Sequence, residues 1–445
     1  ISAIARDSKA VVGVGMPGDG DDLTPLLQCI VDHVPPPSVD PDGPLQAIVT
    51  NLDASDYLGR LAIGRVVRGT MRKGERVALL DEEVLEGTRP VDRKLVGLMG
   101  FSGIGREDVE ERIAGDLFVV AGFPEVEIGD TLADPLNPEA LPRLSVDEPV
   151  LRMTFGVNTS PLAGKEGKYL TSRHLRERLE REALGNVSIR LEDTDSPDVL
   201  EVAGRGELQL AVLIETMRRE GYELQASRPE VIVKDIDGKR HEPLERGVCD
   251  VPEEHVGTVT QALAPRKGRV TDLRPGDTGR TVVTFEAPAR GLIGFRGLLL
   301  TATRGTALLH THHAGWTPWV GDLPHRQGGA MLADRTGVTT AYALDNLQTR
   351  GELFVGSGVT VYEGMVIGEN SRPEEMIVNC VREKQKTNIR THASDDAVKL
   401  VPPKVHTLES AIEFIAEDEL VEVTPANIRI RKRVLKEQDR RRLKR

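Results

Sequence analysis

Apolar residues in the first 145 positions follow two different periods. Between residues 22 and 34, Leu26, Leu27, Ile30, Val31 and Val34 lie on one face of a predicted helix. Thr24 is its expected N-cap, Pro25 suits its first turn, and prolines follow it. Residues 44–135 instead alternate short apolar runs with glycine turns, and the runs are 45–49, 61–67, 76–80, 94–98 and 117–121. This regular spacing predicts a small antiparallel β-barrel.

Residues 146–228 change to an order that mixes strands and helices. The pattern predicts a strand at 149–157, a helix beginning at 171, strands at 187–193 and 199–203, a helix at 206–220 and a strand at 222–227. This βαββαβ order is typical of a ferredoxin-like sandwich. Residues 229–309 repeat nearly the same order, with helices near 253–264 and 291–303. We therefore expect two ferredoxin-like domains in tandem.

From residue 310 onward the pattern consists mainly of short β-runs, at 338–344, 359–361, 375–381 and 397–400. One helix at 408–415 has an apolar stripe, and strands at 420–423 and 427–431 follow it. The predicted fold class is therefore multidomain α+β. Its parts are the last helix and linker of a preceding domain (1–37), the barrel (38–145), two ferredoxin-like α/β sandwiches (146–228 and 229–309) and a β-rich C-terminal domain with a packed helix (310–445).

The composition indicates what kind of core and which cell compartment to expect. Hydrophobic residues make up 39% and aromatic residues only 3% of the 445 positions, so the cores must be aliphatic. No apolar stretch is long enough to cross a membrane, and Cys29, Cys249 and Cys380 lack metal-binding spacing. We expect a cytoplasmic protein with no membrane partner. The chain begins at Ile1 without an initiator methionine, which we interpret as a piece of something longer.

Positive charge gathers at the C-terminal end of an acidic chain. The formal net charge is −12, yet residues 429–445 hold ten Lys or Arg and two acids. The preceding residues therefore carry roughly −20, and a phosphate-rich partner would meet this end first. RNA is the favoured partner, with a solvated terminus as the alternative. The candidate RNA contacts in this tail are Arg429, Arg431, Lys432 and Arg433.

Two further segments combine basic and small polar residues. Residues 384–390 lie between two predicted strands and contain Lys384, Lys386, Asn388 and Arg390, which suit phosphate or ribose contacts. Residues 164–168 form a glycine-rich loop with Lys165 and Lys168. Ordinary turns also use glycine and lysine, so each segment alone leaves both interpretations open. Three basic elements in one acidic chain favour RNA binding.

The sequence contains no complete catalytic motif among those considered. A phosphate-binding loop needs Gly-x4-Gly-Lys-Ser/Thr, but the Gly-Lys pairs here are followed by Glu166, Tyr169 and Arg240. The cluster of His310, His312 and His313, with Asp322 and His325, contains residue types that bind zinc. Nearby Gly315, Pro318 and Gly321 favour a surface loop instead. We predict no catalytic residue and no metal site, with a metal-dependent enzyme or a protein-interaction scaffold as the rival interpretation.

Several segments together resemble the BipA/TypA family of translational GTPases. They are Asp22-Leu23-Thr24-Pro25-Leu26 with Ile30-Val31-Asp32-His33-Val34-Pro35, Val157-Asn158-Thr159-Ser160-Pro161 with Gly164-Lys165-Glu166-Gly167-Lys168, Gly204-Arg205-Gly206-Glu207-Leu208, Met217-Arg218-Arg219-Glu220-Gly221, Arg290-Gly291-Leu292-Ile293-Gly294-Phe295-Arg296 and Leu420-Val421-Glu422-Val423-Thr424-Pro425. They span nearly the whole chain. The segment from His310 to His325, with Trp316 and Trp319, fits the family pattern poorly.

The resemblance implies a role on the ribosome. The family docks in the factor-binding site, contacts both subunits, rRNA and tRNA, and is associated with large-subunit assembly and growth in the cold. By the resemblance, Ser2 and Ala3 look like the end of the guanine-recognition motif. GTP and Mg²⁺ belong to the full-length family, which is a GTPase, and we expect neither bound to this chain. Because this sequence lacks the phosphate-binding loop and the purine-recognition motif, we expect it to be inactive alone. We expect a monomer. Within the same superfamily, a fragment of a translocating elongation factor is the alternative.

Overall fold

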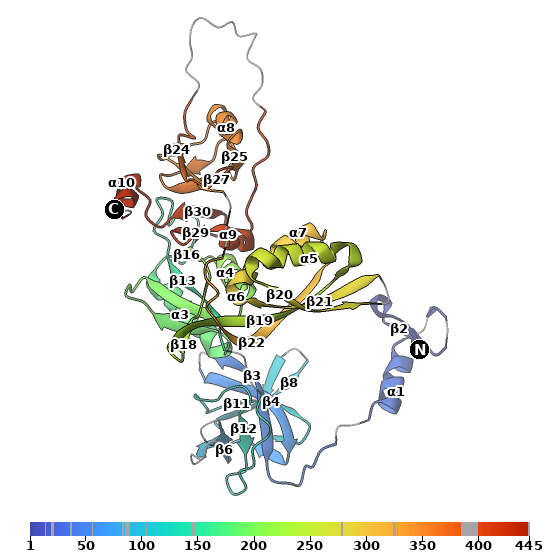
Figure 1. Cartoon of the computed structure of the whole chain (residues 1–445). Coiled ribbons are helices and arrows are strands. Elements are labelled where there is room, and N and C mark those ends of the chain that lie inside the picture. Colours follow the sequence, from blue (N-terminus) through green and yellow to red (C-terminus); the bar gives the residue numbers. More distant parts are fainter. Residues whose placement is uncertain are drawn as a thin grey trace, which may run out of the picture. The chain divides into compact units, whose positions relative to one another are not determined.

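The chain divides into two compact units, residues 1–145 and 146–445 (Figure 1). The computed structural model describes all residues except 14, 19–21, 36–37, 56, 82–83, 85–89, 104, 145–147, 277–278, 324–325, 327, 384–398 and 444–445. Strands predominate in both units, and the predicted multidomain α+β class is confirmed.

The first unit begins with a short hairpin and one helix. Strands β1 (Ser2–Ile4) and β2 (Lys9–Val11) pair on either side of a 3₁₀ turn (Ala5–Asp7), and α1 spans Thr24–His33. The predicted helix is present, but its predicted cap is wrong. Thr24 is the first helical residue, and its backbone N–H donates to Asp22 Oδ1 at 2.9 Å. Asp22 therefore supplies the carboxylate that satisfies this helix end. No residue of α1 is buried.

The remainder of the first unit is an antiparallel eight-stranded sheet. In sheet order its strands are β7 (Val91–Lys94), β6 (Arg76–Leu80), β12 (Thr131–Ala133), β3 (Gln46–Ser55), β4 (Gly59–Arg68), β11 (Leu117–Ala121), β8 (Gly97–Ser102) and β9 (Gly105–Asp108), and β5 (Thr70–Arg72) pairs separately with β10 (Glu111–Ile113). Within the described residues no ladder joins β9 back to β7, so the expected closed barrel is corrected to an open sheet. Alternating apolar residues specify antiparallel pairs, whereas closure depends on strand tilt and stagger.

The first ferredoxin-like domain of the second unit has the predicted order. Strand β13 (Leu151–Val157) leads to α3 (Ser172–Gly185), β14 (Arg190–Asp193), β15 (Val199–Gly204), α4 (Glu207–Glu220) and β16 (Leu224–Ala226). The sheet order β14-β15-β13-β16 is that of a ferredoxin-like sandwich. Helix α3 begins as predicted, because the Thr171 side chain accepts a hydrogen bond from the His174 backbone N–H.

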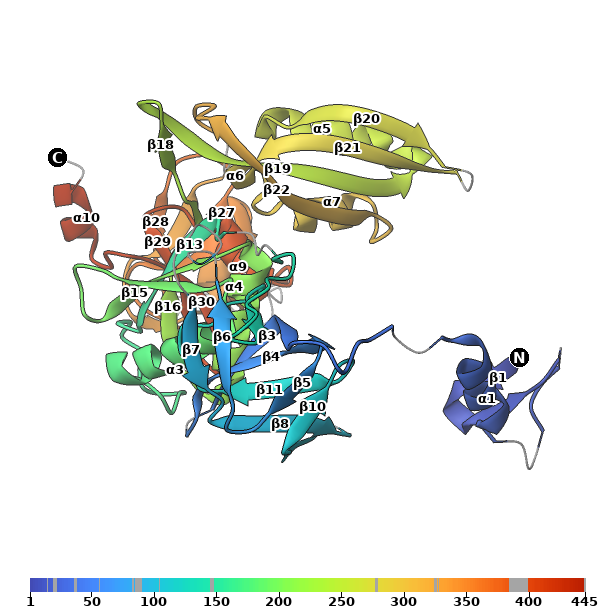
Figure 2. The ribbon, with the colours of Figure 1, turned by 90° about the horizontal axis from the view of Figure 1, so that it is seen from below.

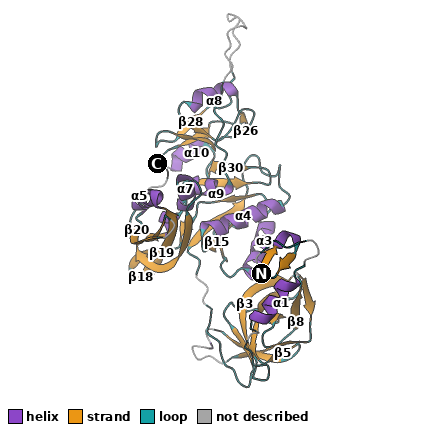
Figure 3. Cartoon of the chain, turned by 90° about the vertical axis from the view of Figure 1, so that its right-hand side faces the viewer, coloured by secondary structure: helices purple, strands orange, loops and turns teal. Residues whose placement is uncertain are grey.

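The C-terminal strands continue this same sheet, which the sequence did not predict. Strand β29 (Glu419–Val423) pairs with β16, and the order then runs through β30 (Ile428–Lys432), β27 (Met365–Asn370), β23 (Ala330–Ala333) and β28 (Met376–Val378) to give eleven strands, with β17 (Glu230–Val231) on β13 and β25 (Gly351–Leu353) on β27. Helices α4 and α9 (Leu408–Phe414) pack against each other (Figure 3). Leu210, Ile214, Leu408 and Ile412 share one buried cluster there. The C-terminal part is thus fused to the first ferredoxin-like domain by both sheet and core.

The second ferredoxin-like domain has its own five-stranded sheet. Its strands are β18 (Lys234–Ile236), β19 (Lys239–Pro252), β20 (Arg269–Pro275), β21 (Arg280–Pro288) and β22 (Leu308–Pro318), and its helical segments are the 3₁₀ turn Glu253–His255, α5 (Val256–Leu263), the 3₁₀ turn Ala264–Arg266, α6 (Ala289–Leu292) and α7 (Phe295–Ala302). Strands β20, β21, β19 and β22 lie side by side in Figure 2. Helices α5 and α7 cover one face, where Val259, Leu263, Phe295 and Leu299 are buried. The predicted βαββαβ order is confirmed.

Three local predictions in the C-terminal half need correction. Residues 310–318 are not a loop but most of β22, and this strand crosses the boundary expected at residue 310. Residues 338–344 are not one strand: β24 (Gly337–Val338) pairs with β26 (Thr360–Val361), and α8 (Ala341–Gln348) follows. The Thr340 side chain caps α8 by accepting from the Ala343 N–H, which outweighs the β-propensity of the segment. Lys399 and Leu400 are not in a strand, and 397–398 lie outside the described residues.

A last helix, α10 (Glu437–Leu443), was not predicted, and it lies within the basic tail. In the described part of the chain, no helix is long and apolar enough to cross a membrane.

Candidate nucleic-acid interface

A buried charged cluster holds the first ferredoxin-like domain and the C-terminal strands together. At its centre the Glu422 side chain on β29 is fully buried. Its carboxylate accepts hydrogen bonds from Asn158 (3.2 Å), Ser160 (2.8 Å), Arg429 (3.0 Å) and the Tyr362 hydroxyl (2.5 Å). Burial and the Glu422 charge raise the pKa of Tyr362, so its hydroxyl stays protonated and donates. This carboxylate has a full set of partners, as a buried charge requires.

Arg429 is part of this joint and not of a surface. It bridges Glu422 and Glu166, with its Nη2 atom 2.6 Å from Glu166 Oε1, and its side chain is 10% exposed. Burial acts to raise the pKa of Glu166, but hydrogen bonds from Thr424, Asn427 and Arg429 lower it below its usual value. Glu166 lies in the glycine-rich loop, so Arg429 ties that loop to strand β30.

Arg431 and Lys432 are also interior, which corrects their prediction as surface RNA contacts. Arg431 is 1% exposed and donates to Thr159 and Gln225, while burial lowers its pKa. Lys432 is 3% exposed, and its Nζ atom lies within 3.0 Å of carboxylate oxygens of Glu375, Asp418 and Glu419. Burial acts to lower the pKa of Lys432, but these carboxylates raise it overall. Strand β30 lies inside the sheet, so Arg431 and Lys432 bind interior polar and acidic side chains.

The glycine-rich loop binds a carboxylate with its backbone. The backbone N–H groups of Gly164, Glu166 and Gly167 donate to the buried Glu223 carboxylate at 2.8, 2.9 and 2.6 Å. A Cβ atom at Gly167 would lie 2.3 Å from Glu223 Cγ, so this position requires glycine. These three backbone amides are therefore already occupied. The Lys165 and Lys168 side chains are the parts of the loop that can meet a partner.

The remaining predicted contacts fall into two groups. Arg433, just after β30, is exposed, and its guanidinium makes one long hydrogen bond of 3.4 Å to the Glu417 carbonyl. Lys384, Lys386, Asn388 and Arg390 lie outside the described residues. Ser2 and Ala3 belong to β1, and Ser2 Oγ donates to the Gly13 carbonyl at 2.9 Å.

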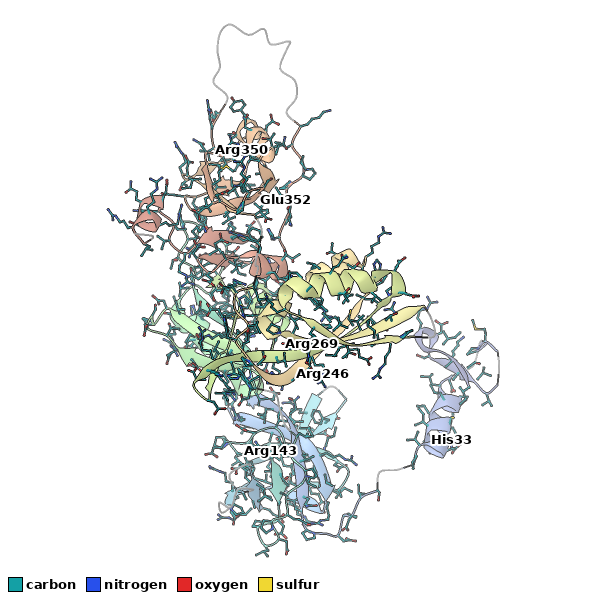
Figure 4. The ribbon with its side chains drawn as sticks, in the orientation of Figure 1. His33, Arg143, Arg246, Arg269, Arg350 and Glu352 are labelled. Atoms are coloured by element: carbon teal, nitrogen blue, oxygen red, sulfur yellow. The ribbon has the colours of Figure 1, made fainter. Side chains whose placement is uncertain are left out.

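Many other surface cations are paired with acids. Figure 4 labels Arg246 and Arg269 on the second ferredoxin-like sheet, and both lie within 3.0 Å of Glu286. The helix cations Arg173, Arg176 and Arg178 each pair with a glutamate or aspartate. Candidate cations for an external phosphate are therefore fewer than the basic residue count suggests.

His310, His312 and His313 lie along strand β22, and both Trp316 in that strand and Trp319 just after it contact cations. His310 and His312 alternate with Thr311 along the strand, so they share one face, and His313 packs its ring against Trp316. Lys234 lies 4.5 Å from the Trp316 ring centre, while Arg290 and Arg240 lie 3.8 and 4.7 Å from that of Trp319. The described residues contain no group of three or more side chains placed to hold a metal ion. His325 lies outside them.

Two of the family-like segments meet between the ferredoxin-like domains. The Glu207 carboxylate, at the start of α4, accepts from the Gly294 backbone N–H at 3.1 and 3.2 Å. Gly294 has a φ of 70°, which favours glycine there. Burial, together with the charge of Glu413, raises the pKa of Glu207 to about 7. The sequence showed both segments, but only the fold shows that they contact each other.

Matches to known proteins cover most of the chain. A family model described as the TypA/BipA C-terminal domain matches residues 328–437, and one described as the elongation factor G C-terminus matches residues 239–327. A Salmonella typhimurium protein named large ribosomal subunit assembly factor BipA is 48% identical over 98% of this chain and 72% of its own length. The Synechocystis protein of that name is 46% identical over 93% of this chain and 69% of its own length.

Among solved structures, a crystal structure of a Thermus thermophilus protein is similar at a TM-score of 0.42 and 17% identity. The match covers 66% of this chain and 59% of that one. A likeness this low does not define the fold.

Proposed function

This chain belongs to the BipA/TypA family, and from that premise we propose that it acts on the ribosome as a large-subunit assembly factor of the BipA type. The observation that carries the proposal is the extent of the similarity. Identity of 48% over 98% of the chain includes both ferredoxin-like domains and the C-terminal strands. The name of that relative states the assembly role for the relative.

We propose that exposed cations make the rRNA and tRNA contacts. Lys165 and Lys168 project from a loop that Glu223 and Arg429 hold in place, and Arg433 follows the strand that anchors it. The basic segment with Lys384, Lys386, Asn388 and Arg390 is the second contact, proposed from the sequence. Contacts of this kind neutralise phosphates and release counterions. Arg429, Arg431 and Lys432 are excluded because they hold the joint together.

The finer features of the proposal come from the family resemblance. The protein binds as a monomer in the factor site between the subunits, in the cytoplasm, and its loss impairs growth in the cold. GTP hydrolysis by these residues is not included, because the 445-residue sequence has no Gly-x4-Gly-Lys-Ser/Thr loop.

Sedimentation with purified ribosomes and separate subunits, at low and moderate salt, tests this proposal. The wild-type chain is compared with K165Q/K168Q and with K384A/K386A/R390A. The matched control is K239Q/R219Q, which removes two exposed cations from β19 and α4. The wild-type chain should co-sediment. The logarithm of its binding constant should fall by roughly 0.7 to 0.9 per phosphate contact for each tenfold rise in salt concentration.

Both K165Q/K168Q and K384A/K386A/R390A should weaken binding and lower the slope of binding against salt, whereas the control should behave like the wild type. Binding that does not depend on salt would contradict the proposed contacts. So would a control that weakens binding as much as these two variants do. Absence of co-sedimentation under all conditions would contradict ribosome binding by this chain.

A further inference from the structure

A large cleft opens where the two ferredoxin-like domains and helix α9 of the second unit meet. Its volume is about 990 Å³. Its wall comes from the segment after β16, from α6, from residues around Trp319 and from the C-terminal end of α9. This volume lies at the upper end of the range for sites that enclose small organic molecules.

Two arginines on the cleft wall are held rigidly from behind. Arg290 pairs with Glu242 through contacts of 2.5 and 3.0 Å, and Arg326 pairs with Glu419 through contacts of 2.7 and 2.8 Å. Both glutamate side chains are fully buried. Arg290 also lies against the Trp319 ring and Arg326 against the Phe414 ring, at 3.8 and 4.5 Å. Their guanidinium groups are therefore fixed in place at the cleft wall.

Arg228 is different, because no carboxylate pairs with it in the described part of the chain. Its Nε atom is buried and has no hydrogen-bond partner. Burial lowers the pKa of Arg228, and the charges of Arg290 and Arg326 act in the same direction against those of Glu417 and Glu230. An arginine remains charged even so. A partly buried guanidinium without a carboxylate at hydrogen-bond distance is costly, and a bound anion would lower that cost.

Two more cations, Arg240 and Arg266, and an apolar wall line the cleft, together with Arg152, Lys404 and the carboxylates of Glu230, Asp322, Glu369, Glu413 and Glu417. Arg240 is exposed at the rim against Trp319, and among the described residues it has no ion-pair partner. Arg266 donates to the carbonyls of Gly291 and Ile293 at 2.8 and 2.9 Å. Val231, Ile293 and Leu298 contribute apolar surface. Guanidinium groups suit phosphate oxygens, and the apolar wall suits an organic group attached to the phosphate.

We propose that this cleft binds a small organic phosphate of about nucleotide size, with its phosphate at Arg228 beside Arg290 and Arg326. The organic part lies against Val231, Ile293 and Leu298. Arg228 is the specificity-determining cation, since Arg290 and Arg326 already have buried partners. Because the site joins both ferredoxin-like domains and α9, the bound ligand stabilises their arrangement. This proposal does not rest on ribosome binding.

Fluorescence titration of the 445-residue chain tests the site. Trp316 and Trp319 are its two tryptophans, and only Trp319 lines the cleft, so W316F leaves a single reporter at the site. The probes are inorganic pyrophosphate, ADP and, as an uncharged comparison, adenosine. Calorimetry with the unmodified chain provides a second readout. We expect saturable binding of ADP and pyrophosphate and at least tenfold weaker binding of adenosine.

The R228Q variant should lose about tenfold or more in affinity for ADP, because it removes the unpaired charge. The matched control is R173Q, which makes the same change at an 85% exposed side chain on α3 and should bind as the unmodified chain does. Since R228Q alters a partly buried site, its circular dichroism and melting temperature are measured alongside. R240Q, at the exposed rim, supplies a second test and should lose about threefold.

Three results would overturn the proposal. They are no saturable binding of either phosphate at millimolar concentration, equal affinity in folded R228Q and the unmodified chain, and binding of a short single-stranded RNA where ADP and pyrophosphate do not bind. The last would assign the cleft to a polynucleotide instead. None of these titrations contains ribosomes, so their failure is distinct from a failure of the ribosome proposal.

Discussion

The two ferredoxin-like domains have the same strand order but use their fourth strand differently. In the first domain β16 pairs with β29, so the sheet continues for five more strands in its main path. In the second domain β22 pairs only with β19 among the described residues. Charged residues on the added strands β29 and β30 are consequently interior, as with Glu422 and Arg431, whereas Arg246 and Arg269 of the second sheet reach solvent and pair with the half-buried Glu286. Burial, and not the fold type, decides what a charged residue does here.

The largest effect should come from removing the centre of the buried joint. We expect E422A to lower the free energy of unfolding of the second unit by about 3 to 5 kcal/mol, because Arg429 would lose one carboxylate and Asn158 and Ser160 their acceptor. Urea denaturation followed by circular dichroism measures it. A loss below about 1 kcal/mol would show that the joint is not the structural centre described above.

A smaller effect should follow from releasing the glycine-rich loop. We expect E223Q to cost about 1 to 3 kcal/mol, because one amide oxygen cannot replace a carboxylate that accepts from three backbone N–H groups. Hydrogen exchange of residues 164–167 should accelerate, while that of the second ferredoxin-like sheet stays unchanged. Unchanged exchange in the loop would contradict the role assigned to Glu223. R173Q serves as the charge-altering control on the neighbouring helix.

The contact between the domains should depend on pH through Glu207. Its pKa is raised from 4.5 to about 7 in the folded protein, so the folded state holds this proton more tightly than the unfolded chain does. This contribution is complete below pH 4.5 and is lost as the pH rises through 7. We expect the free energy of unfolding to fall by about 1 to 2 kcal/mol between pH 6 and pH 8. The E207Q variant should show a flatter profile, and an identical slope in both proteins would refute the assignment.

The smallest effect should come from Glu286, whose two arginine partners reach solvent. We expect E286A to change the free energy of unfolding by less than about 1 kcal/mol, although its carboxylate contacts both Arg246 and Arg269. Both arginines reach solvent and are rehydrated when the acid is removed. The same urea denaturation applies, at low and high salt. A cost equal to that of E422A would remove the distinction between the charged residues of the two sheets.

Local patterns predicted most of the regular elements. The βαββαβ order of both ferredoxin-like domains followed from apolar spacing and turn residues, and Thr171 correctly indicated the start of α3. Thr340 was a comparable cap signal, but β-branched neighbours concealed it and α8 was interpreted as a strand. Strand β22 was interpreted as a loop because its glycines and prolines resemble turn residues, while its partner β19 is more than fifty positions away.

The candidate interface was predictable only in part. The lysines of the glycine-rich loop remain available, as an RNA contact requires, but the loop amides bind Glu223 from a distant part of the chain. Arg429, Arg431 and Lys432 belong to the basic tail in the sequence, but in the fold they lie in the interior of the sheet. Arg228 was not singled out, because an isolated Ser-Arg-Pro segment carries no signal until the cleft around it is known.

The sequence by itself determined the family, the strand and helix order and the sorting of charge toward one end, since these depend on residues close together in the chain or on a pattern spread along it. The tertiary structure alone decided which charges are buried, which loop amides are occupied and which cations are left for a ligand. The physical reason is that desolvation and pairing depend on neighbours from other strands. Glu422, Glu223 and Glu242 each receive such neighbours from distant parts of the chain.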